Sequence, residues 1–563
     1  FARARGRCEI RPNTENVLKM IHYLLTGEQS DKKLESEFII ELLKKFNKKG
    51  IFNENNTELV IDDVIKFSFY AGHGGVSTLE YENIQTKYSF ENVGSIFYNQ
   101  YLIPNPHYCN LYSLYLKISS DYDIMFDNNN EVILYINSLY YDISVSKSIK
   151  EIKIDFDASL DKMYDGWFKN LEKITFNDKF NNKIYPGVFP NVKEIVFGSN
   201  FNSQIVPGAF PKLEKIIFFM DSHFNQPIEK GIFPALEEIV FPPGFNSQIN
   251  PGDMPNVKKI TFSDYSQFDK EIIAETFPEL TEITFGKDFN SQIQPDAMPN
   301  VKKITFAANS KFNQSIEEGT FPALEEITFG NYFNNQFKQH TLQKIKKITF
   351  IGQSQFNKPI LEGTFPELEE ITFGQHFDSQ IKPDSMPNVK EITFHMNSKF
   401  NKEIEARSFP SLGKITFGEK FNSQIIPGAM PNVKIVIFNY SEFDREIKAG
   451  TFPELEEIAF GPNFNKPINP GAMPNVKKIS FGVSSQFNQP IEKDTFPKLE
   501  EITFGGSFNS QIVPGAIPNV TKIVFVMDSH FNQPIEKGIF QALEEIAFPP
   551  DFNSQIHPGD MPN

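Results

Sequence analysis

Cysteine, tryptophan and long apolar runs are scarce in this chain of 563 residues, and each scarcity excludes a class of protein. Only two cysteines occur, Cys8 and Cys109, so no disulfide framework is expected and a reducing, intracellular compartment is the natural one. No apolar run approaches the roughly 18 residues that a membrane span requires. Basic residues are outnumbered, and the formal net charge of −16 argues against a nucleic-acid partner.

Phenylalanine is abundant instead, with 59 copies, and it recurs at a fixed spacing. At eighteen regularly spaced positions between Phe180 and Phe552, a phenylalanine is followed at once by Asn or Asp. The steps between these anchor phenylalanines alternate between 21 and 23 residues, with one step of 22 between Phe421 and Phe443. A fixed period in the twenties indicates that each unit is one supersecondary element that stacks on its neighbours. We therefore expect a solenoid.

Each unit carries one short strand pattern. In Leu324-x-x-Ile327-x-Phe329 the first, fourth and sixth residues are expected to point inward, as in a leucine-rich-repeat strand, while Glu326 and Thr328 face out. Because successive units run in the same sense, the sheet should be parallel. Proline and glycine crowd the return to the next strand, as at Pro186, Gly187 and Pro190, and they disfavour a regular helix there. Turns and short 3₁₀ or extended pieces are expected on this convex side.

These patterns divide the chain into two parts. Residues 149–563 are expected to form a leucine-rich-repeat-like solenoid of about 18 repeats of 21–23 residues, incomplete at its C-terminal end, with one long parallel sheet on the concave face. Residues 1–148 are not repetitive and are expected to form a small mixed α/β capping domain. Helical spacing occurs at residues 13–25 and 34–46, and tyrosine-rich strand-like stretches follow.

The anchor dipeptide has an expected structural role. The phenylalanine should fill the core, and successive rings should stack as a spine along the solenoid. The amide beside it can bind the backbone of the adjacent coil, with Asp at 269, 378 and 444 keeping the acceptor but losing the donor. The expected structural ladder includes Asn225, Asn246, Asn290, Asn313, Asn334, Asn357, Asn401 and Asn422.

The true period is about 44 residues, because acidic and basic units alternate. The 21-residue half ends in Phe-Pro-x-Leu-Glu-Glu and the 23-residue half in Met-Pro-Asn-Val-Lys-Lys. The resulting charged face either recognises a protein partner or neutralises itself through cross-strand ion pairs, and alternating signs favour the second reading. The candidate partner-binding residues on this concave face are Glu237, Glu238, Lys258, Lys259, Thr261, Lys302, Lys303, Thr305, Glu325, Glu326, Thr328, Lys346, Lys347, Thr349, Glu369 and Glu370.

The repeat departs from its own rule in two places, which are either sequence drift or a partner site. At residues 337–344 the usual Pro-Gly turn is missing, and at residues 434–438 the basic pair becomes Lys434-Ile435. Residues 220–256 and 527–563 are almost identical, which indicates block duplication and a role in which length matters more than any unique residue.

One segment resembles a catalytic motif. Residues 67–75 are an apolar run ending in Gly-His-Gly-Gly, similar to the histidine strand of caspase-like and metacaspase peptidases. The partner thiol would be Cys109, but its surroundings lack the apolar strand and the Gly-rich oxyanion site that this chemistry uses. His73 and Cys109 are therefore weak candidates, and we expect no enzyme, no cofactor and no metal site.

The motif Phe-Asn-x-Pro-Ile, as in residues 224–228, 356–360 and 487–491, resembles the FNIP repeat across residues 171–563. Proteins of this family are known from social amoebae and giant DNA viruses. The resemblance implies a protein-binding solenoid, often joined to an F-box that recruits a ubiquitin ligase, although no clear Leu-Pro start of an F-box is visible here. We therefore predict a non-enzymatic interaction scaffold in the cytoplasm of a host cell, with an unidentified protein partner. The alternatives are a structural component of a virus particle that self-associates end to end, and a substrate-binding ubiquitin-ligase adaptor.

Overall fold

The computed structural model describes residues 171–438, 440–557 and 559–561, together with the backbone of six short strands between residues 77 and 154. The chain divides into two compact units, Phe1–Ser263 and Asp264–Asn563, and each is treated by itself. The helices expected at residues 13–25 and 34–46 lie outside the described residues.

Unit 1 contains a two-stranded antiparallel sheet and the first repeat strands. Strands β3, β4 and β5 pair in antiparallel fashion, whereas each pairing from β5 to β11 is parallel. Strand β6 pairs with β7 in the same parallel register as the later repeat strands. The strands of unit 1 are β1 (Ser77–Leu79), β2 (Tyr88–Phe90), β3 (Leu116–Ile118), β4 (Tyr122–Phe126), β5 (Val132–Ile136), β6 (Glu151–Ile154), β7 (Lys173–Phe176), β8 (Glu194–Phe197), β9 (Lys215–Phe218), β10 (Glu238–Phe241) and β11 (Lys259–Phe262).

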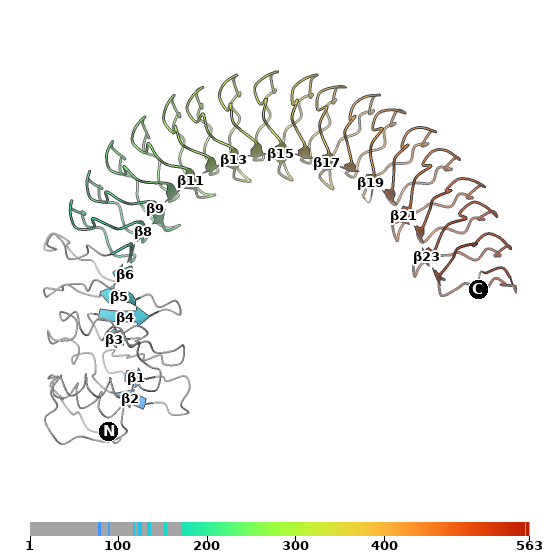
Figure 1. Ribbon diagram of the computed structural model, residues 1–563, viewed down its shortest axis with the longest axis horizontal. Helices are drawn as coiled ribbons and strands as arrows, with labels where there is room; N and C mark the ends of the chain where they lie inside the picture. Colours follow the sequence, from blue (N-terminus) through green and yellow to red (C-terminus); the bar gives the residue numbers. More distant parts are fainter. Residues whose placement is uncertain are drawn as a thin grey trace, which may run out of the picture. The chain divides into compact units, whose positions relative to one another are not determined.

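Unit 2 consists of thirteen parallel strands that follow the chain order. In Figure 1 these strands lie along the inner side of the arc that unit 2 describes, and the returning loops form its outer side. The strands are β12 (Glu282–Phe285), β13 (Lys303–Phe306), β14 (Glu326–Phe329), β15 (Lys347–Phe350), β16 (Glu370–Phe373), β17 (Glu391–Phe394), β18 (Lys414–Thr416), β19 (Ile435–Ile437), β20 (Glu457–Phe460), β21 (Lys478–Phe481), β22 (Glu501–Phe504), β23 (Lys522–Phe525) and β24 (Glu545–Ala547).

Strand β14 shows how the sequence pattern sets the orientation of each side chain. Leu324, Ile327 and Phe329 are buried, while Glu326 and Thr328 face the solvent side of the sheet. Ile327 lies opposite Ile348 of β15 and Thr328 lies opposite Thr349. Identical residues therefore meet from coil to coil. The predicted parallel repeat sheet is confirmed.

Two columns of phenylalanine fill the core. The anchor ring Phe333 stacks on Phe312 of the preceding coil at a centroid distance of 6.1 Å. The strand residue Phe329 stacks on Phe350 of the next coil at 5.3 Å, and it lies 4.0 Å from Phe333 within its own coil. The expected spine is thus a double one, in which each strand ring is bound to an anchor ring. Aromatic pairs of this kind contribute roughly 0.5–1.5 kcal/mol beyond the burial of their area.

The return path consists of two successive β-turns. Ala209 N donates to Val206 O, and Leu213 N donates to Phe210 O. Gly208, the third residue of the first turn, has φ of +81°, as a type II turn requires. A residue with positive φ interrupts a 3₁₀ ladder, and in the part of the chain that the structure describes no 3₁₀ helix occurs. The return path is built there from turns and short extended pieces, and isolated parallel bridges such as Ile184–Ile205 join some of these pieces.

Candidate interaction surface

The sheet face carries three parallel rows of outward-facing side chains. In β14 the rows are represented by Glu325, which precedes the strand, by Glu326 and by Thr328. We call the equivalent positions of all strands the outer row, the middle row and the threonine row. Because the strands pair in register, each row joins residues of the same repeat position in neighbouring coils.

Middle-row charges are bound to one another. Lys347 Nζ lies 2.6 Å from Glu370 Oε2, and Lys414 Nζ lies 2.8 Å from Glu391 Oε1. The hydrogen bond from its ammonium to Glu370 raises the pKa of Lys347 above the ordinary lysine value. The further middle-row pairs, at 2.9 to 3.5 Å, are Lys173–Glu194, Lys215–Glu238, Lys303–Glu326, Lys478–Glu501 and Lys522–Glu545.

Outer-row charges are paired as well, and some glutamates bind two lysines. Glu456 lies 2.7 Å from Lys434 Nζ and 3.1 Å from Lys477 Nζ, and these hydrogen bonds lower the pKa of its carboxyl group. Glu325 likewise lies between Lys302 and Lys346. The other outer-row pairs are Lys258–Glu237 and Lys390–Glu369, both at 2.7 Å, and Lys193–Glu214 at 3.2 Å. Exposed pairs of this kind contribute little to stability, but they cancel the local field.

The threonine row gives the face a neutral polar strip. In unit 2 it runs through seven successive strands, whose residues are Thr284, Thr305, Thr328, Thr349, Thr372, Thr393 and Thr416. In unit 1 the row begins with Thr175 and includes Thr261, but Val196, Ile217 and Val240 replace threonine between them. All of these side chains are partly exposed, so the strip is accessible to a partner.

Of the sixteen residues expected to bind a partner, the structure places every one on this face. The lysines and glutamates Glu237, Glu238, Lys258, Lys302, Lys303, Glu325, Glu326, Lys346, Lys347, Glu369 and Glu370 are engaged in ion pairs with one another or with their row neighbours. Lys259 lies opposite Glu238 in the register. Thr261, Thr305, Thr328 and Thr349 belong to the threonine row.

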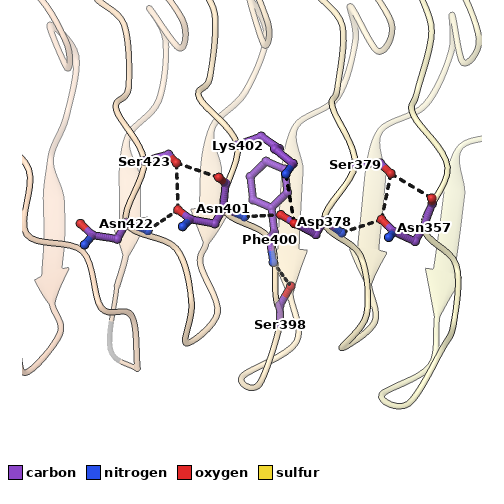
Figure 2. Close-up of polar contacts among 9 residues, drawn as sticks. All are labelled: Asn357, Asp378, Ser379, Ser398, Phe400, Asn401, Lys402, Asn422 and Ser423. Carbon is purple, nitrogen blue, oxygen red and sulfur yellow. Dashed lines mark hydrogen bonds and ion pairs between the residues drawn. The ribbon is translucent and has the colours of Figure 1, made fainter.

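The anchor amides form a hydrogen-bonded ladder away from this face. Asp378 N donates to Asn357 Oδ1 at 2.8 Å, Asn401 N donates to Asp378 Oδ1 at 2.9 Å, and Asn422 N donates to Asn401 Oδ1 at 2.8 Å (Figure 2). Asp378 therefore serves as acceptor in the same way as asparagine, and Lys402 neutralises it at 3.0 Å. The same backbone-to-side-chain bond joins Asn225 with Asn246, Asn290 with Asn313, and Asn313 with Asn334. These amides bind the protein's own backbone.

A row of buried serines is a feature that our sequence analysis missed. Ser398 is fully buried and its Oγ accepts a hydrogen bond from Phe400 N at 3.2 Å (Figure 2). Equivalent serines lie in the other 23-residue halves of the described repeats and in the 22-residue half, at residues 222, 266, 310, 354, 441, 485 and 529. The signal was available, because a serine stands two residues before every second anchor phenylalanine, including the one in the 22-residue step.

The irregular segment at residues 337–344 keeps the repeat geometry. Phe337 takes the place of the usual isoleucine and is buried, with its ring 5.1 Å from Phe365. His340 adopts φ of +66°, the turn position that glycine occupies in most repeats. Gln339 Nε2 donates to Glu362 O of the next coil. The core and the turn therefore accommodate these changes from the repeat sequence without a change in fold.

The two weak catalytic candidates, His73 and Cys109, lie outside the described residues. In the described ranges, no three His, Cys, Asp or Glu side chains gather in a way that could hold a metal ion. No helix within those ranges has the length and apolar character needed to cross a membrane.

The geometry of the stacked repeats defines the class of protein. Short parallel strands with the L-x-x-I-x-F pattern, stacked coil on coil with turns between them, make this chain a leucine-rich-repeat-type solenoid. The FNIP Repeat family matches residues 190–220, 268–308, 356–397, 443–484 and 487–526, and four of these matches begin at an anchor phenylalanine. The chain belongs to the FNIP-repeat family.

Several solved structures are similar to the chain. CroV588, described as a novel circular LRR protein, shares 23% identity at a TM-score of 0.45, over 80% of this chain and 78% of that one. In the Toll–Spätzle complex from Drosophila the match has 10% identity and a TM-score of 0.42, over 73% and 63%. In the TLR13–ssRNA13 complex it has 9% identity and a TM-score of 0.31, over 79% and 88%. A comparison with curated proteins finds no match.

Proposed function

We propose that this chain is a non-catalytic scaffold that binds a protein partner through the sheet face of its repeats. The observation that carries the proposal is the uninterrupted threonine row from Thr284 to Thr416, flanked by the charged middle row. Such a strip presents hydroxyl groups and fixed charges at regular intervals on a rigid sheet. A polypeptide whose polar and charged groups are spaced at the same intervals could form many hydrogen bonds and ion pairs along this strip.

The size of the face supports the same proposal. Thirteen strands spaced by about 4.8 Å extend over about 60 Å, and the three rows add width. A standard protein interface needs roughly 800 Å² on each partner, which a face of this length supplies. Because lysines and glutamates neutralise each other, recognition would depend on the local pattern of charge rather than on long-range attraction.

A photocrosslinking experiment tests the proposal. A benzoylphenylalanine at Thr349, on the sheet face, is expected to capture a protein from an extract of the native host. The matched control is the same probe at Glu318, which lies exposed in a turn on the opposite side of the coil. Equal capture at both positions, or capture at neither, would contradict binding through the sheet face.

Sedimentation of the isolated chain gives a second readout. A scaffold for other proteins should sediment as one species whose mass does not depend on concentration. A mass that rises with concentration would instead favour the structural-assembly alternative, in which copies of this chain associate.

A further inference from the structure

The middle row follows a directional rule. Wherever a middle-row glutamate of a 21-residue half forms one of the ion pairs described here, its partner is the lysine of the preceding strand and not that of the following strand. The pairs that show this rule in unit 2 are Lys303–Glu326, Lys347–Glu370, Lys478–Glu501 and Lys522–Glu545. Loss of one lysine should therefore leave one particular carboxylate without its partner.

That loss occurs at β19. Ile435 takes the lysine position and lies between Lys414 of β18 and Glu457 of β20 in the register. Lys414 binds Glu391 on its other side, and Lys478 of the following strand binds Glu501. Within the described part of the chain, the Glu457 carboxylate has neither an ion pair nor a hydrogen bond, although the residue is only partly exposed.

Other substitutions gather at the same strands. Ile437 and Ala459 replace threonine in the threonine row, and they lie opposite each other. Gly413 stands in the outer row, where the other 21-residue halves of unit 2 have glutamate or, at residue 281, threonine. The single 22-residue step, between Phe421 and Phe443, falls in the same region. We call Ile435, Ile437, Glu457 and Ala459 the β19 break.

The β19 break combines an aliphatic surface with an unpaired negative charge. Ile435 and Ile437 face the same side of the strand, roughly 6.6 Å apart along the chain. Both are partly exposed, so apolar area is left for a partner to cover. An approaching chain that covered this area would desolvate Glu457, and that is unfavourable unless the chain brings a cation.

This charge distinguishes the break from the apolar stretch of unit 1. There, Val196, Ile217 and Val240 also replace threonine in adjacent strands. The middle-row charges beside them are nevertheless satisfied, through Lys173–Glu194 and Lys215–Glu238. Apolar area alone does not specify an occupant, whereas an unpaired carboxylate beside it does.

We infer that the β19 break is a docking site for a polypeptide segment that presents an aliphatic side chain next to a lysine or arginine. The aliphatic group would lie on Ile435 and Ile437 above the small Ala459. The cationic group would replace the missing lysine as the partner of Glu457. This inference rests on the proposed scaffold function and assigns one location and one partner chemistry to it.

Selection from a random-peptide display library tests the site directly. The bait is the full chain, and the counter-selection uses the Ile435→Lys variant. Lysine is the residue of the other basic strands, so this variant is expected to fold normally and to pair with Glu457. Selected peptides should carry a basic and an aliphatic residue in close succession, and Ile435→Lys should weaken their binding at least about tenfold, or about 1.4 kcal/mol. Glu457→Gln should weaken binding of the same peptides.

A transplanted site provides the matched control. Lys347→Ile, Thr349→Ile and Thr372→Ala together reproduce the break at β15 and β16, where Glu370 would lose its lysine. Calorimetry of this triple variant with a selected peptide should give two sites per chain, against one for the unchanged chain.

Three results would overturn the inference: selected peptides without a basic residue, binding that Ile435→Lys leaves unchanged, and a transplant that still binds one peptide. Its failure is distinguishable from failure of the scaffold function. If the peptide results are negative while the probe at Thr349 still captures a protein, the location is wrong and the scaffold stands. If neither experiment gives binding, both proposals are wrong.

Discussion

At the residue scale, the closest fit in the coil stack lies between the buried serines and the glycines of the next coil. A Cβ at Gly418 would stand 2.3 Å from His395 O and 2.6 Å from Ser398 Cβ. Gly374 and Gly505 face Ser354 and Ser485 at the same 2.6 Å. Several coils therefore carry a glycine where the long loop of the preceding coil bends over it, whereas Pro242 and Pro549 stand at this position in two others.

We expect Gly418→Ala to destabilise the protein by about 3 kcal/mol, because overpacking forces the backbone of two coils apart. Gly482→Ala is the matched control, since its nearest neighbouring atom is 3.9 Å away and its φ is not in the left-handed region. The control should be neutral or slightly stabilising. Urea unfolding followed by circular dichroism measures both, and equal effects would disprove the close-packing argument.

The amide ladder leads to a second prediction at this scale. Asn488 Oδ1 accepts hydrogen bonds from Asn509 N and Ser510 Oγ, both at 2.8 Å. Asn488→Asp keeps this acceptor, as Asp378 does, and should leave stability nearly unchanged. Asn488→Leu removes it and should lower the free energy of unfolding by about 1 kcal/mol. A thermal unfolding series that ranks the two variants in the opposite order would contradict the ladder's role.

At the element scale, the charged rows link each strand to its neighbours and set a pH range for their contribution. Hydrogen bonds to lysine lower the pKa of Glu369 and Glu456 below the ordinary value of 4.5. Hydrogen bonds to glutamate raise the pKa of Lys347 and Lys434 above 10.5.

The contribution of the ion pairs should therefore be complete between pH 4.5 and pH 10.5. It should be lost as the pH falls through the lowered carboxyl pKa values, and also as it rises through the raised lysine pKa values. Thermal midpoints measured across this range should show a plateau with a decline at each end. High salt should flatten the decline, because these pairs are exposed. A midpoint that changes steadily between these limits would show that other groups dominate.

Strand register gives a separate prediction. Lys347 lies opposite Glu326 on one side and Glu370 on the other, so Lys347→Glu would place like charges in three adjacent strands. We expect a loss of about 1 kcal/mol that salt partly restores. Lys347→Gln removes the charge without adding repulsion and should lose less. Identical losses in low and high salt for the two variants would rule out an electrostatic role in register.

At the scale of the whole molecule, the repeating element is the double unit rather than the single coil. Phe312 and Phe356 are 44 residues apart (356 − 312 = 44), and this segment contains one long and one short half. Since coils contact only their neighbours, stability should depend on which halves meet at each interface.

Removal of residues 312–355 should therefore leave a cooperatively folded solenoid with a similar melting temperature. Removal of residues 312–332 instead joins two basic halves, so that β13 meets β15 and Lys303 faces Lys347. Ser310 also loses Gly330, the glycine that packs against it. We expect the single-coil deletion to melt at a clearly lower temperature in a calorimetric scan. Equal melting temperatures would show that the two halves are interchangeable.

The sequence by itself determined the coil. Its 21- and 23-residue steps gave the number of strands, and the L-x-x-I-x-F pattern gave the buried set, because side-chain direction alternates along a strand whatever surrounds it. In-register pairing of Ile327 with Ile348 follows from identical units stacked in one direction. The anchor amides were predictable as hydrogen-bond acceptors for the same local reason.

Only the tertiary structure decided which groups meet between coils. A glutamate has a lysine strand on each side, and the choice of the preceding one depends on positions and rotamers that no period specifies. That choice leaves Glu457 unpaired. The fit of Ser398 against Gly418 depends on how far one loop bends over the next coil. Such contacts join residues about twenty positions apart across a curved stack, so their distances follow from the packing of whole coils and not from the pattern within one.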